Sequence, residues 1–353
     1  HLAARKSFRN HKKTKEDNLE MKIAFFEIEG WEKKYLESKL KGHKLLFFKD
    51  ELNGKLIKSI KDVDLISVFI YSQINKEILD KLPNLKAIAT MSTGYDHIDV
   101  KECKKRKIKI LNVPYYGENT VAEHTFALIL ALSRKIHKSY EKTIRGNFSL
   151  EGLRGFDLKN KTIGVIGLGH IGEHVVRIAN GFEMNILVSS PHKNKKLANK
   201  YKLKFTSLNN LLKNSDIITL HCPLTKKTEH LINKKNIKLI KEEAYIINTA
   251  RGGLIDTSAL VKALAKGKLG GAALDVLEEE SLIKEERQLL SKNFPKENLQ
   301  NLLENHLLLT FENVIITPHN AFNSKEALNR IIDTTIENIK CTNSNKKCIN
   351  LVK

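Results

Sequence analysis

The chain has 353 residues, of which 41% are hydrophobic and 29% charged, and its formal net charge is +21. This length allows two domains of ordinary size, and the composition is that of a soluble globular protein rather than a disordered or membrane-embedded one. The basic excess is mostly lysine, spread among acidic residues and without a recognition motif. We interpret it as a solvated surface that attracts anions to any cleft, and we expect no nucleic-acid partner.

Apolar runs and cysteine positions indicate the cellular environment. No apolar run reaches membrane-spanning length, and no charged-then-apolar leader opens the chain, so we expect a cytoplasmic protein without a membrane partner. The cysteines are scattered and lack the paired spacing of metal ligands. Free thiols in a reducing compartment and no metal site are therefore expected.

The first 113 residues predict a tail and a parallel sheet. Residues 1–20 are basic and poor in apolar side chains, which predicts a disordered tail. Short strands then alternate with helices, a pattern typical of βαβ units. The strands are predicted at 22–26, 44–48, 65–69, 87–90 and 109–112, and the helices between them include 31–40 and 76–82. This segment has no phosphate-binding glycine motif.

A long helix is predicted from residue 120 to about 145, connecting the first domain to the second. Thr120 and Glu123 have the spacing of a capping box. Apolar residues at helical spacing, from Val121 to Ile136, supply one face of the helix.

Residues 162–172 hold the pattern of a dinucleotide-binding turn. A β-branched apolar run ends at Ile166, Gly167, Gly169 and Gly172 follow as G-x-G-x-x-G, and a helix-compatible run comes next. The first glycine allows the tight turn, the second lets a pyrophosphate approach the backbone, and the third lets the helix pack against the strand. The N–H groups of the helix N-terminus would hold the pyrophosphate. A glycine turn in another doubly wound protein is the alternative, and the flanking strand and helix favour a dinucleotide.

The remaining elements complete a second parallel sheet. Strands are predicted at 185–189, 217–221, 245–248, 271–275 and 314–317, a helical excursion at 281–311, and an amphipathic helix at 324–339. The predicted fold is α/β, with two doubly wound, Rossmann-like parallel-sheet domains and an active-site cleft between them. Residues 21–119 and 320–353 would form the substrate domain, and residues 120–319 the dinucleotide-binding domain.

Chemically capable residues follow strands of the second domain, where a parallel sheet binds its ligands. Arg251 and His319 come directly after predicted strands, and Glu280 lies five residues past Asp275. Arginine binds a carboxylate in a fork, and a glutamate beside a histidine keeps it protonated. A protonated histidine next to a carbonyl is the proton donor that hydride transfer requires. Each residue alone could instead be a surface helix cap, a solvated acid or a turn histidine.

Further motifs lie along nearly the whole chain past the tail. They are Ser-Thr-Gly-Tyr-Asp-His-Ile-Asp at 92–99, Asn-Val-Pro-Tyr-Tyr at 112–116, Val-Ala-Glu-His at 121–124, Gly-Asn-Phe-Ser-Leu-Glu-Gly-Leu at 146–153, His-Cys-Pro-Leu-Thr at 221–225, Asn-Thr-Ala-Arg-Gly at 248–252, Leu-Asp-Val at 274–276 and Thr-Pro-His-Asn-Ala-Phe at 317–322. With the glycine motif, these segments resemble the D-isomer-specific 2-hydroxyacid dehydrogenases, most closely the D-lactate dehydrogenase branch.

The resemblance implies a role for each matching residue. Arg251 would bind the substrate carboxylate, His319 would be the acid/base with Glu280 as its partner, and Asp275 would hold the nicotinamide carboxamide. The residues implied to line the cofactor are Gly167, Gly169, His170, Ile171, Gly172, Ser190, Cys222, Pro223, Thr228, Thr249 and Ala250. The residues implied to contact the substrate are Thr93 and Gly94, through backbone N–H groups, and Phe69, Tyr116 and Phe322, as pocket walls.

One position departs from the family pattern. NAD-preferring members carry an aspartate at the end of the strand after the glycine motif, where it binds the ribose hydroxyls. Ser190 occupies that place here, followed by His192 and Lys193. No carboxylate repels a 2′-phosphate, so NADP(H) is a real alternative to NAD(H), which the lactate branch mostly uses.

Together these features predict an NAD(P)-dependent oxidoreductase that interconverts a short 2-keto acid and its D-2-hydroxy acid, with pyruvate and D-lactate as the leading pair. Other D-2-hydroxy acids, such as hydroxyisocaproate, glycerate or phosphoglycerate, stay open. A dinucleotide-sensing binding protein on the same scaffold, like the corepressor relatives of this superfamily, is the alternative from another class. The resemblance also implies a homodimer built around the helix at 120–145.

Overall fold

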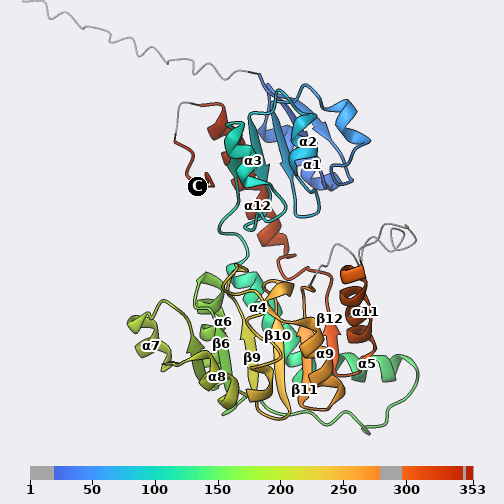
Figure 1. The fold of residues 1–353 in the computed structure, drawn as a ribbon, viewed down its shortest axis with the longest axis vertical. Helices are drawn as coiled ribbons and strands as arrows, with labels where there is room; N and C mark the ends of the chain where they lie inside the picture. The colour runs from blue at the N-terminus through green and yellow to red at the C-terminus, as the bar shows by residue number, and fades with distance from the viewer. Residues whose placement is uncertain (1–19, 279–295, 345–346, 353) are drawn as a thin grey trace, which may run out of the picture. The chain divides into compact units, whose positions relative to one another are not determined.

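The computed structural model describes residues 20–278, 296–344 and 347–352, and the chain divides into two compact units (Figure 1). Residues 1–116 with 328–353 form the five-stranded unit, and residues 117–327 form the seven-stranded unit. Strands pair in parallel within both sheets, and helices flank them. The predicted α/β class with two Rossmann-like sheets is therefore confirmed. Of the predicted tail, residues 1–19 lie outside the described residues.

The five-stranded sheet has the strand order β2-β1-β3-β4-β5. Its strands are β1 (Lys22–Phe25), β2 (Lys44–Phe47), β3 (Leu65–Val68), β4 (Ala87–Thr90) and β5 (Lys109–Leu111). The connecting helices are α1 (Gly30–Lys39), η1 (Leu56–Ser59), α2 (Lys76–Asp80) and α3 (Val100–Lys105). The strands β3 and β4 are buried at every position, because a parallel sheet is covered on both faces. Continuous apolar runs of this kind are why the observed strands lie within one residue of the predicted ranges.

The C-terminal part of the chain enters the five-stranded unit through α12 (Lys325–Thr342). Beyond the helix, the Val352 N–H donates to the Ile110 carbonyl at 2.9 Å, so the last residues pair with β5. A disulfide joins Cys341 to Cys348, and the other two cysteines are free. The expectation of free thiols is therefore wrong for this pair, because the fold-back onto β5 brings together two cysteines that no spacing rule pairs.

The seven-stranded sheet has the strand order β12-β11-β10-β9-β6-β7-β8. Its strands are β6 (Thr162–Ile166), β7 (Asn185–Ser189), β8 (Lys204–Phe205), β9 (Ile217–Leu220), β10 (Ala244–Asn248), β11 (Leu269–Leu274) and β12 (Val314–Ile316). Its helices are α4 (Glu118–Ser133), α5 (Ile136–Ile144), α6 (His170–Gly181), α7 (Lys195–Tyr201), α8 (Leu208–Asn214), η2 (Ile237–Leu239), η3 (Gly252–Leu254), α9 (Thr257–Ala265) and α11 (Lys296–Thr310). The first part of the predicted excursion at 281–311 lies outside the described residues, and α11 forms its second part.

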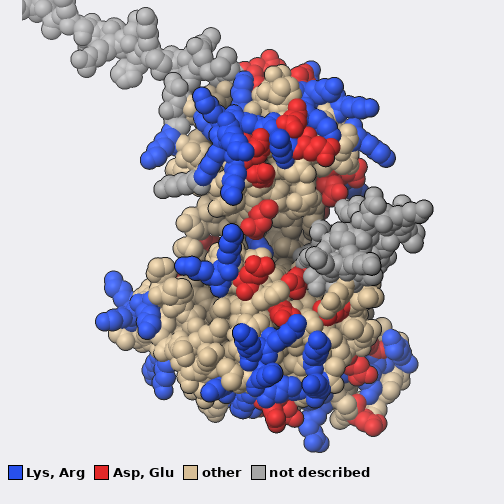
Figure 2. All heavy atoms as spheres, in the orientation of Figure 1, with Lys and Arg blue, Asp and Glu red and all other residues tan. Residues whose placement is uncertain are grey.

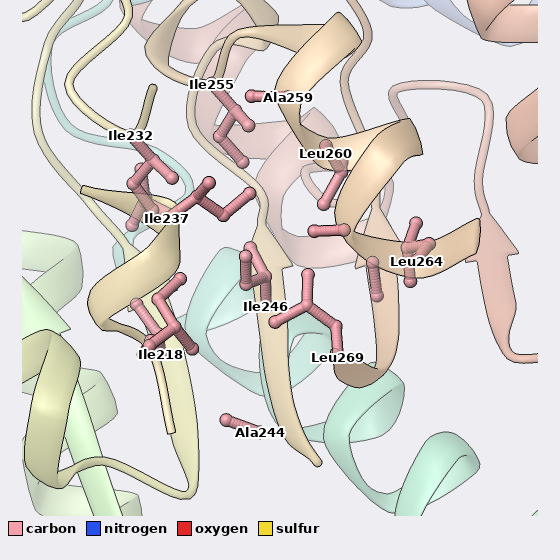
Figure 3. Packing of buried hydrophobic residues seen from close by; sticks show 14 of the residues in the cluster. Ile218, Ile232, Ile237, Ala244, Ile246, Ile255, Ala259, Leu260, Leu264 and Leu269 are labelled. Atoms are coloured by element: carbon pink, nitrogen blue, oxygen red, sulfur yellow. The ribbon is translucent and has the colours of Figure 1, made fainter. Parts of the chain in front are cut away.

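Two apolar layers bury the seven-stranded sheet. On one face, Leu260 and Leu264 of α9 pack with Ile246 of β10 and Leu269, which begins β11 (Figure 3). On the opposite face, α4, α6 and α7 pack against the alternate residues of the same strands. Each leucine buried in this way stabilises the fold by about 2 kcal/mol. Because both faces are covered, the strand ends are the part of the sheet that a ligand can reach.

The long helix predicted from residue 120 is two helices. Gly117 is the N-cap of α4 and no side chain caps it, so the capping box expected at Thr120 and Glu123 is wrong. Lys135 adopts a left-handed φ of 51° and separates α4 from α5. This conformation costs a lysine about 1 kcal/mol. No glycine or proline marks the break in the sequence.

Basic side chains are spread over the face of the molecule drawn in Figure 2, with acidic side chains between them. This distribution is that of a solvated lysine-rich surface. No helix in the described ranges has both the length and the apolar character needed to cross a membrane.

Candidate active site

Six neighbouring strands of the seven-stranded sheet end at one edge, and each leads into a residue that the sequence singled out. In the sheet order β12-β11-β10-β9-β6-β7, these residues are His319, Asp275, Arg251, Cys222, Gly167 and Ser190. Neighbouring strands lie about 4.8 Å apart, so the six ends extend over roughly 24 Å. The carboxyl-end edge of a doubly wound sheet is where such proteins bind ligands, and the candidate residues are therefore gathered where binding is expected.

The glycine turn after β6 has the geometry that its sequence predicts. Gly167 has a φ of 96°, which L side chains rarely adopt. A Cβ atom on Gly172 would lie 2.2 Å from the Gly167 carbonyl oxygen. Helix α6 therefore reaches the turn only because no side chain stands at residue 172. Backbone geometry requires both glycines, as in a dinucleotide-binding motif.

The N-terminus of α6 suits an external anion. Its N-cap is the exposed Gly169, which offers no side chain to cap the first turn, and a Cβ atom there would meet nothing within 4 Å. His170 and Ile171 follow as the first helical residues. A helix N-terminus without a side-chain acceptor favours a phosphate. These residues therefore fit the pyrophosphate group of a dinucleotide.

His221 supports the glycine turn, a role that the sequence analysis did not assign. A Cβ atom on Gly167 would lie 2.6 Å from the His221 carbonyl oxygen, so the two backbones are in close contact. The Nε2 atom of His221 is 2.8 Å from the Thr219 hydroxyl. Burial lowers the pKa of His221 to about 3, so the ring is neutral at neutral pH. Its place directly before Cys222 in the 221–225 motif was the available signal.

The loop after β9 carries three of the expected cofactor residues. Cys222 is a free thiol whose pKa is raised by burial, which favours the neutral thiol over the nucleophilic thiolate. The Thr228 hydroxyl donates to the Pro223 carbonyl at 2.6 Å, and the Thr225 N–H donates to Thr228 Oγ1 at 2.8 Å. Thr228 thus holds the shape of this loop.

The turn after β10 carries Arg251. Asn248 closes the turn, accepting the Ala250 N–H at 3.0 Å on Oδ1 and donating from Nδ2 to the Arg251 carbonyl at 2.9 Å. The hydroxyl of Thr249 is 2.9 Å from that of Thr125 on α4. The Arg251 Nη1 atom donates to the Ala250 carbonyl at 2.7 Å. The guanidinium is thereby held at the sheet edge, and its planar fork is suited to a carboxylate.

Asp275 holds the turn that carries His319. Its buried carboxylate accepts from the Thr317 hydroxyl and from the N–H groups of Asn320 at 3.0 Å and Ala321 at 2.9 Å. His319 has a φ of 54°, and its N–H donates to the Thr317 carbonyl at 2.9 Å. Such a left-handed residue costs about 1 kcal/mol or more and persists where the surroundings fix it, often at functional sites.

His124 of α4 is the second residue that the sequence analysis missed. Its Nε2 atom lies 3.3 Å from Thr317 Oγ1 and 3.5 Å from Asp275 Oδ1. Burial raises the pKa of Asp275, but hydrogen bonds from His124, Thr317, Ala321 and Asn320 outweigh burial and lower the pKa below its usual value. Asp275 is therefore a carboxylate at neutral pH. The signal for His124 was its place at the end of the 121–124 motif.

Three further candidate residues of this unit are Ser190, Phe322 and Glu280. The Gly167 N–H donates to the Ser189 carbonyl at 2.9 Å, so Ser190 lies one residue past a contact with the glycine turn. Phe322 is half-buried and follows the His319 turn. Glu280 lies outside the described residues. Among the residues that are described, no group of three or more His, Cys, Asp or Glu could hold a metal ion.

The candidate substrate residues of the five-stranded unit lie at the carboxyl-end edge of their own sheet. Phe69 follows β3, Thr93 and Gly94 follow β4, and Tyr116 lies past β5. The Thr93 hydroxyl donates to the Val113 carbonyl at 2.8 Å, which ties the loop after β4 to the segment after β5. This unit thus gathers its candidate residues by the same edge rule as the other unit.

Comparisons with known proteins agree with this geometry. Residues 126–321 match the family model of the D-isomer specific 2-hydroxyacid dehydrogenase, NAD binding domain. A 2-hydroxyacid dehydrogenase homolog of Zymomonas mobilis is 36% identical over 335 residues, which cover 93% of this chain and 98% of the relative. The crystal structure of D-lactate dehydrogenase from Aquifex aeolicus, complexed with NAD and lactic acid, has a TM-score of 0.81 at 36% identity, covering 91% of this chain and 95% of that chain.

A second solved structure is that of an acyclic imino acid reductase in complex with NADPH and D-Arg. Its TM-score is 0.76 at 31% identity, and the match covers 94% of this chain and 100% of that chain. The family model spans more than half of the chain and includes the glycine turn, Arg251, Asp275 and His319. The chain therefore belongs to the D-isomer-specific 2-hydroxyacid dehydrogenases and is an oxidoreductase with an NAD-binding domain.

Proposed function

We propose that this enzyme interconverts a short 2-keto acid and its D-2-hydroxy acid, with pyruvate and D-lactate as the preferred pair. The observation that carries the proposal is the sheet edge on which His319, Asp275 and Arg251 share the strand-end position with the glycine turn. The lactic acid and NAD bound to the Aquifex aeolicus relative support the substrate class and the cofactor. We propose NADP(H) as an additional cofactor because Ser190 supplies no carboxylate, and the NADPH bound to the imino acid reductase supports this.

The residues of the chain would bind the substrate, orient it and move its proton, while NAD(H), when bound, supplies or accepts the hydride. Arg251 would hold the substrate carboxylate through its guanidinium fork, together with the backbone N–H groups of Thr93 and Gly94. His319 would give its proton to the keto oxygen during reduction and take it back during oxidation. Glu280 would keep the imidazole protonated before the transfer.

The proposed domains differ by a few residues from the two compact units, which divide at 116/117 and 327/328. Residues 21–119 and 320–353 would form the substrate domain, and residues 120–319 the dinucleotide-binding domain, because the glycine turn belongs to the latter. The enzyme would act in the cytoplasm, where both nicotinamide cofactors and short 2-keto acids are available to it.

A turnover assay with three variants tests this proposal. Mixing the full chain with NADH and pyruvate should consume NADH, and His319→Gln should lose orders of magnitude in kcat while still binding NADH. Arg251→Lys should raise KM and lower kcat, because a lysine keeps the charge without the fork. His306→Gln, an exposed histidine on α11, is the matched control and should leave both constants unchanged.

The outcomes separate the two functional classes. NADH binding without turnover of pyruvate or of any other short 2-keto acid would favour a dinucleotide-sensing binding protein. Normal turnover in His319→Gln would show that His319 is not the proton donor. Unchanged kinetics in Arg251→Lys would show that residue 251 contributes only its positive charge and not a fork-shaped contact.

We also propose a homodimer formed through α5 and the segment after it. Phe148 is 77% exposed and Leu150 is 83% exposed, and Ile136, Tyr140 and Ile144 of α5 are exposed as well. The three α5 residues are spaced by four and share one helix face. Exposed apolar side chains gathered on one helix face are typical of a protein interface. Sedimentation velocity should show a dimer, and Tyr140→Glu with Phe148→Glu should yield a monomer, whereas a monomeric unmodified chain contradicts the proposal.

A further inference from the structure

A pocket of about 420 Å³ lies in the five-stranded unit, at the C-terminal ends of α1 and α12 and beside the segment that follows the disulfide. Its volume falls within the usual range for small-molecule sites, about 300–1,000 Å³. None of its lining residues belongs to the candidate active site. The pocket is therefore a separate feature of the molecule that the proposed reaction does not use.

The pocket has a strong excess of positive charge. Four lysines line it, Lys39, Lys41, Lys340 and Lys347, against a single carboxylate, that of Glu337. Within the described part of the chain none of the four lysines forms an ion pair, and the Lys39 Nζ atom lies 5.3 Å from the centroid of the Tyr35 ring. Lysines elsewhere in the same unit do pair, such as Lys86 with Asp64 at 2.7 Å and Lys81 with Glu77 at 2.7 Å.

Helix dipoles explain only part of this excess. Lys39 and Lys340 stand in the last turns of α1 and α12, where a cation is favourable beside the free carbonyl groups. Each helix end is equivalent to about half a negative charge. Two helix ends and Glu337 thus offset about two of the four lysine charges. An excess of about two positive charges remains, and an anion entering the pocket would be attracted by it.

The wall of the pocket is held in place before any ligand binds. Asn338, which is 3% exposed, accepts from the Asn350 Nδ2 atom at 2.9 Å and donates to the Asn112 carbonyl at 2.8 Å. Cys341, which also lines the pocket, is joined by a disulfide to Cys348. A pre-formed wall reduces the entropy that binding would otherwise cost.

We propose that this pocket binds a small polyanion, a molecule with two or more phosphate or carboxylate groups. The residual charge of about two favours a dianion or trianion over a monoanion. The pocket volume accommodates a short phosphorylated or polycarboxylic metabolite and excludes a large polymer from its interior. Lys340 from α12 and Lys347 from the C-terminal segment approach the ligand from two elements, so both are needed for full affinity.

Calorimetric titration of the full chain with inorganic pyrophosphate tests the proposal. Saturating NADH is present throughout, so that the probe cannot occupy the glycine turn. Saturable binding is expected, and Lys340→Gln with Lys347→Gln should weaken it by at least about tenfold. The matched control is Lys76→Gln with Lys104→Gln, which removes the same charge from exposed lysines of this unit outside the pocket. The control should change the affinity by less than about twofold.

Citrate and acetate complete the experiment. Citrate at comparable affinity would identify a polycarboxylate ligand, a preference for pyrophosphate would identify a phosphate ligand, and both results support the proposal. Absence of saturable pyrophosphate and citrate binding would overturn it. Equal weakening by the pocket and control pairs would overturn it as well, since the effect would then be one of net charge. Acetate binding as tight as that of the polyanions would contradict the charge argument.

Discussion

The turns after the first strand of each unit differ in whether they contain a side-chain carboxylate. In the five-stranded unit, Glu27 follows β1, and its carboxylate accepts from the N–H groups of Phe69 and Tyr71 at 2.9 Å and from the Ser72 hydroxyl at 2.7 Å. In the seven-stranded unit, the turn after β6 contains glycines and no side-chain cap. The five-stranded unit thus has the carboxylate of Glu27 at the end of its first strand. The seven-stranded unit has no carboxylate there, so an anion of a ligand can bind.

The comparison shows that sheet topology alone does not decide which unit binds the dinucleotide. Strand β1 pairs with β2 on one side and with β3 on the other, so the chain continues first to one side of β1 and then to the opposite side. Strand β6 has the same arrangement, with β7 on one side and β9 on the other. Each is therefore a topological switch point, where ligands bind to open α/β sheets. What differs is the side chain at the turn. In one unit, the carboxylate at the turn accepts from backbone N–H groups of the segment after β3. In the other unit, bare glycines leave the N–H groups of the turn itself for a phosphate.

The largest effect is expected when the glycine turn is closed by a side chain. Gly172→Ala would place a Cβ atom 2.2 Å from the Gly167 carbonyl oxygen, so the turn and α6 must separate. We expect a loss of about a hundredfold or more in NADH affinity, or about 3 kcal/mol, measured by fluorescence titration. Gly181→Ala, in the same helix with nothing within 4 Å, is the control and should bind normally. Unchanged affinity in Gly172→Ala would show that the turn tolerates a side chain.

A smaller effect, and one on stability, is expected when the internal anion is removed. Glu27→Ala leaves two backbone N–H groups without their acceptor, which should cost about 2 kcal/mol in the free energy of unfolding, measured with urea. Glu37→Ala, on the exposed face of α1, should cost less than about 0.5 kcal/mol. NADH affinity should be the same in both variants. A drop in NADH affinity with Glu27→Ala alone would mean that the carboxylate also serves the cofactor site.

Local pattern was sufficient to predict the glycine turn and every strand except the two-residue β8 (Lys204–Phe205). The strands Ala87–Thr90 and Asn185–Ser189 were predicted at their observed bounds because apolar runs mark strand ends, whereas β11 begins two residues before the predicted 271. The break at Lys135 was not predictable, since its left-handed φ depends on packing and lysine carries no turn signal. The Cys341–Cys348 disulfide depends on the return of the C-terminal segment to β5, which is a long-range contact.

In the candidate site, too, positions set by local sequence were predictable, and contacts between residues distant in the chain were not. The rule of strand ends placed Arg251 and His319 correctly at one edge of the sheet. It did not foresee that Asp275 would hold the His319 turn, because those hydrogen bonds join residues more than 40 positions apart in the chain. The contact of His124 with Thr317 was not predictable for the same reason, because His124 lies in α4, which precedes every strand of this sheet in the chain. A sequence motif marks such residues without stating what they contact.

The smallest of the three effects concerns cofactor choice at Ser190, one strand away from the glycine turn. A carboxylate at this place accepts hydrogen bonds from both ribose hydroxyls of NAD and repels the 2′-phosphate of NADP. A serine supplies one neutral hydroxyl and no repulsion, and the exposed side chains of His192 and Lys193 follow it. The unmodified enzyme should therefore use both cofactors.

Ser190→Asp should shift the ratio of kcat/KM for NADH over NADPH by at least about tenfold, which is about 1.4 kcal/mol, because it restores a charged acceptor and adds repulsion. Lys193→Ala should weaken NADPH alone, and more at low salt than at high salt, since an exposed charge is screened. Lys196→Ala, an exposed lysine in α7, is the matched control and should leave the ratio unchanged. If the unmodified enzyme already rejects NADPH and Ser190→Asp changes nothing, a group other than residue 190 must exclude the 2′-phosphate. The open turn after β6 would then select for the pyrophosphate alone, and the choice between the cofactors would be made elsewhere in the protein.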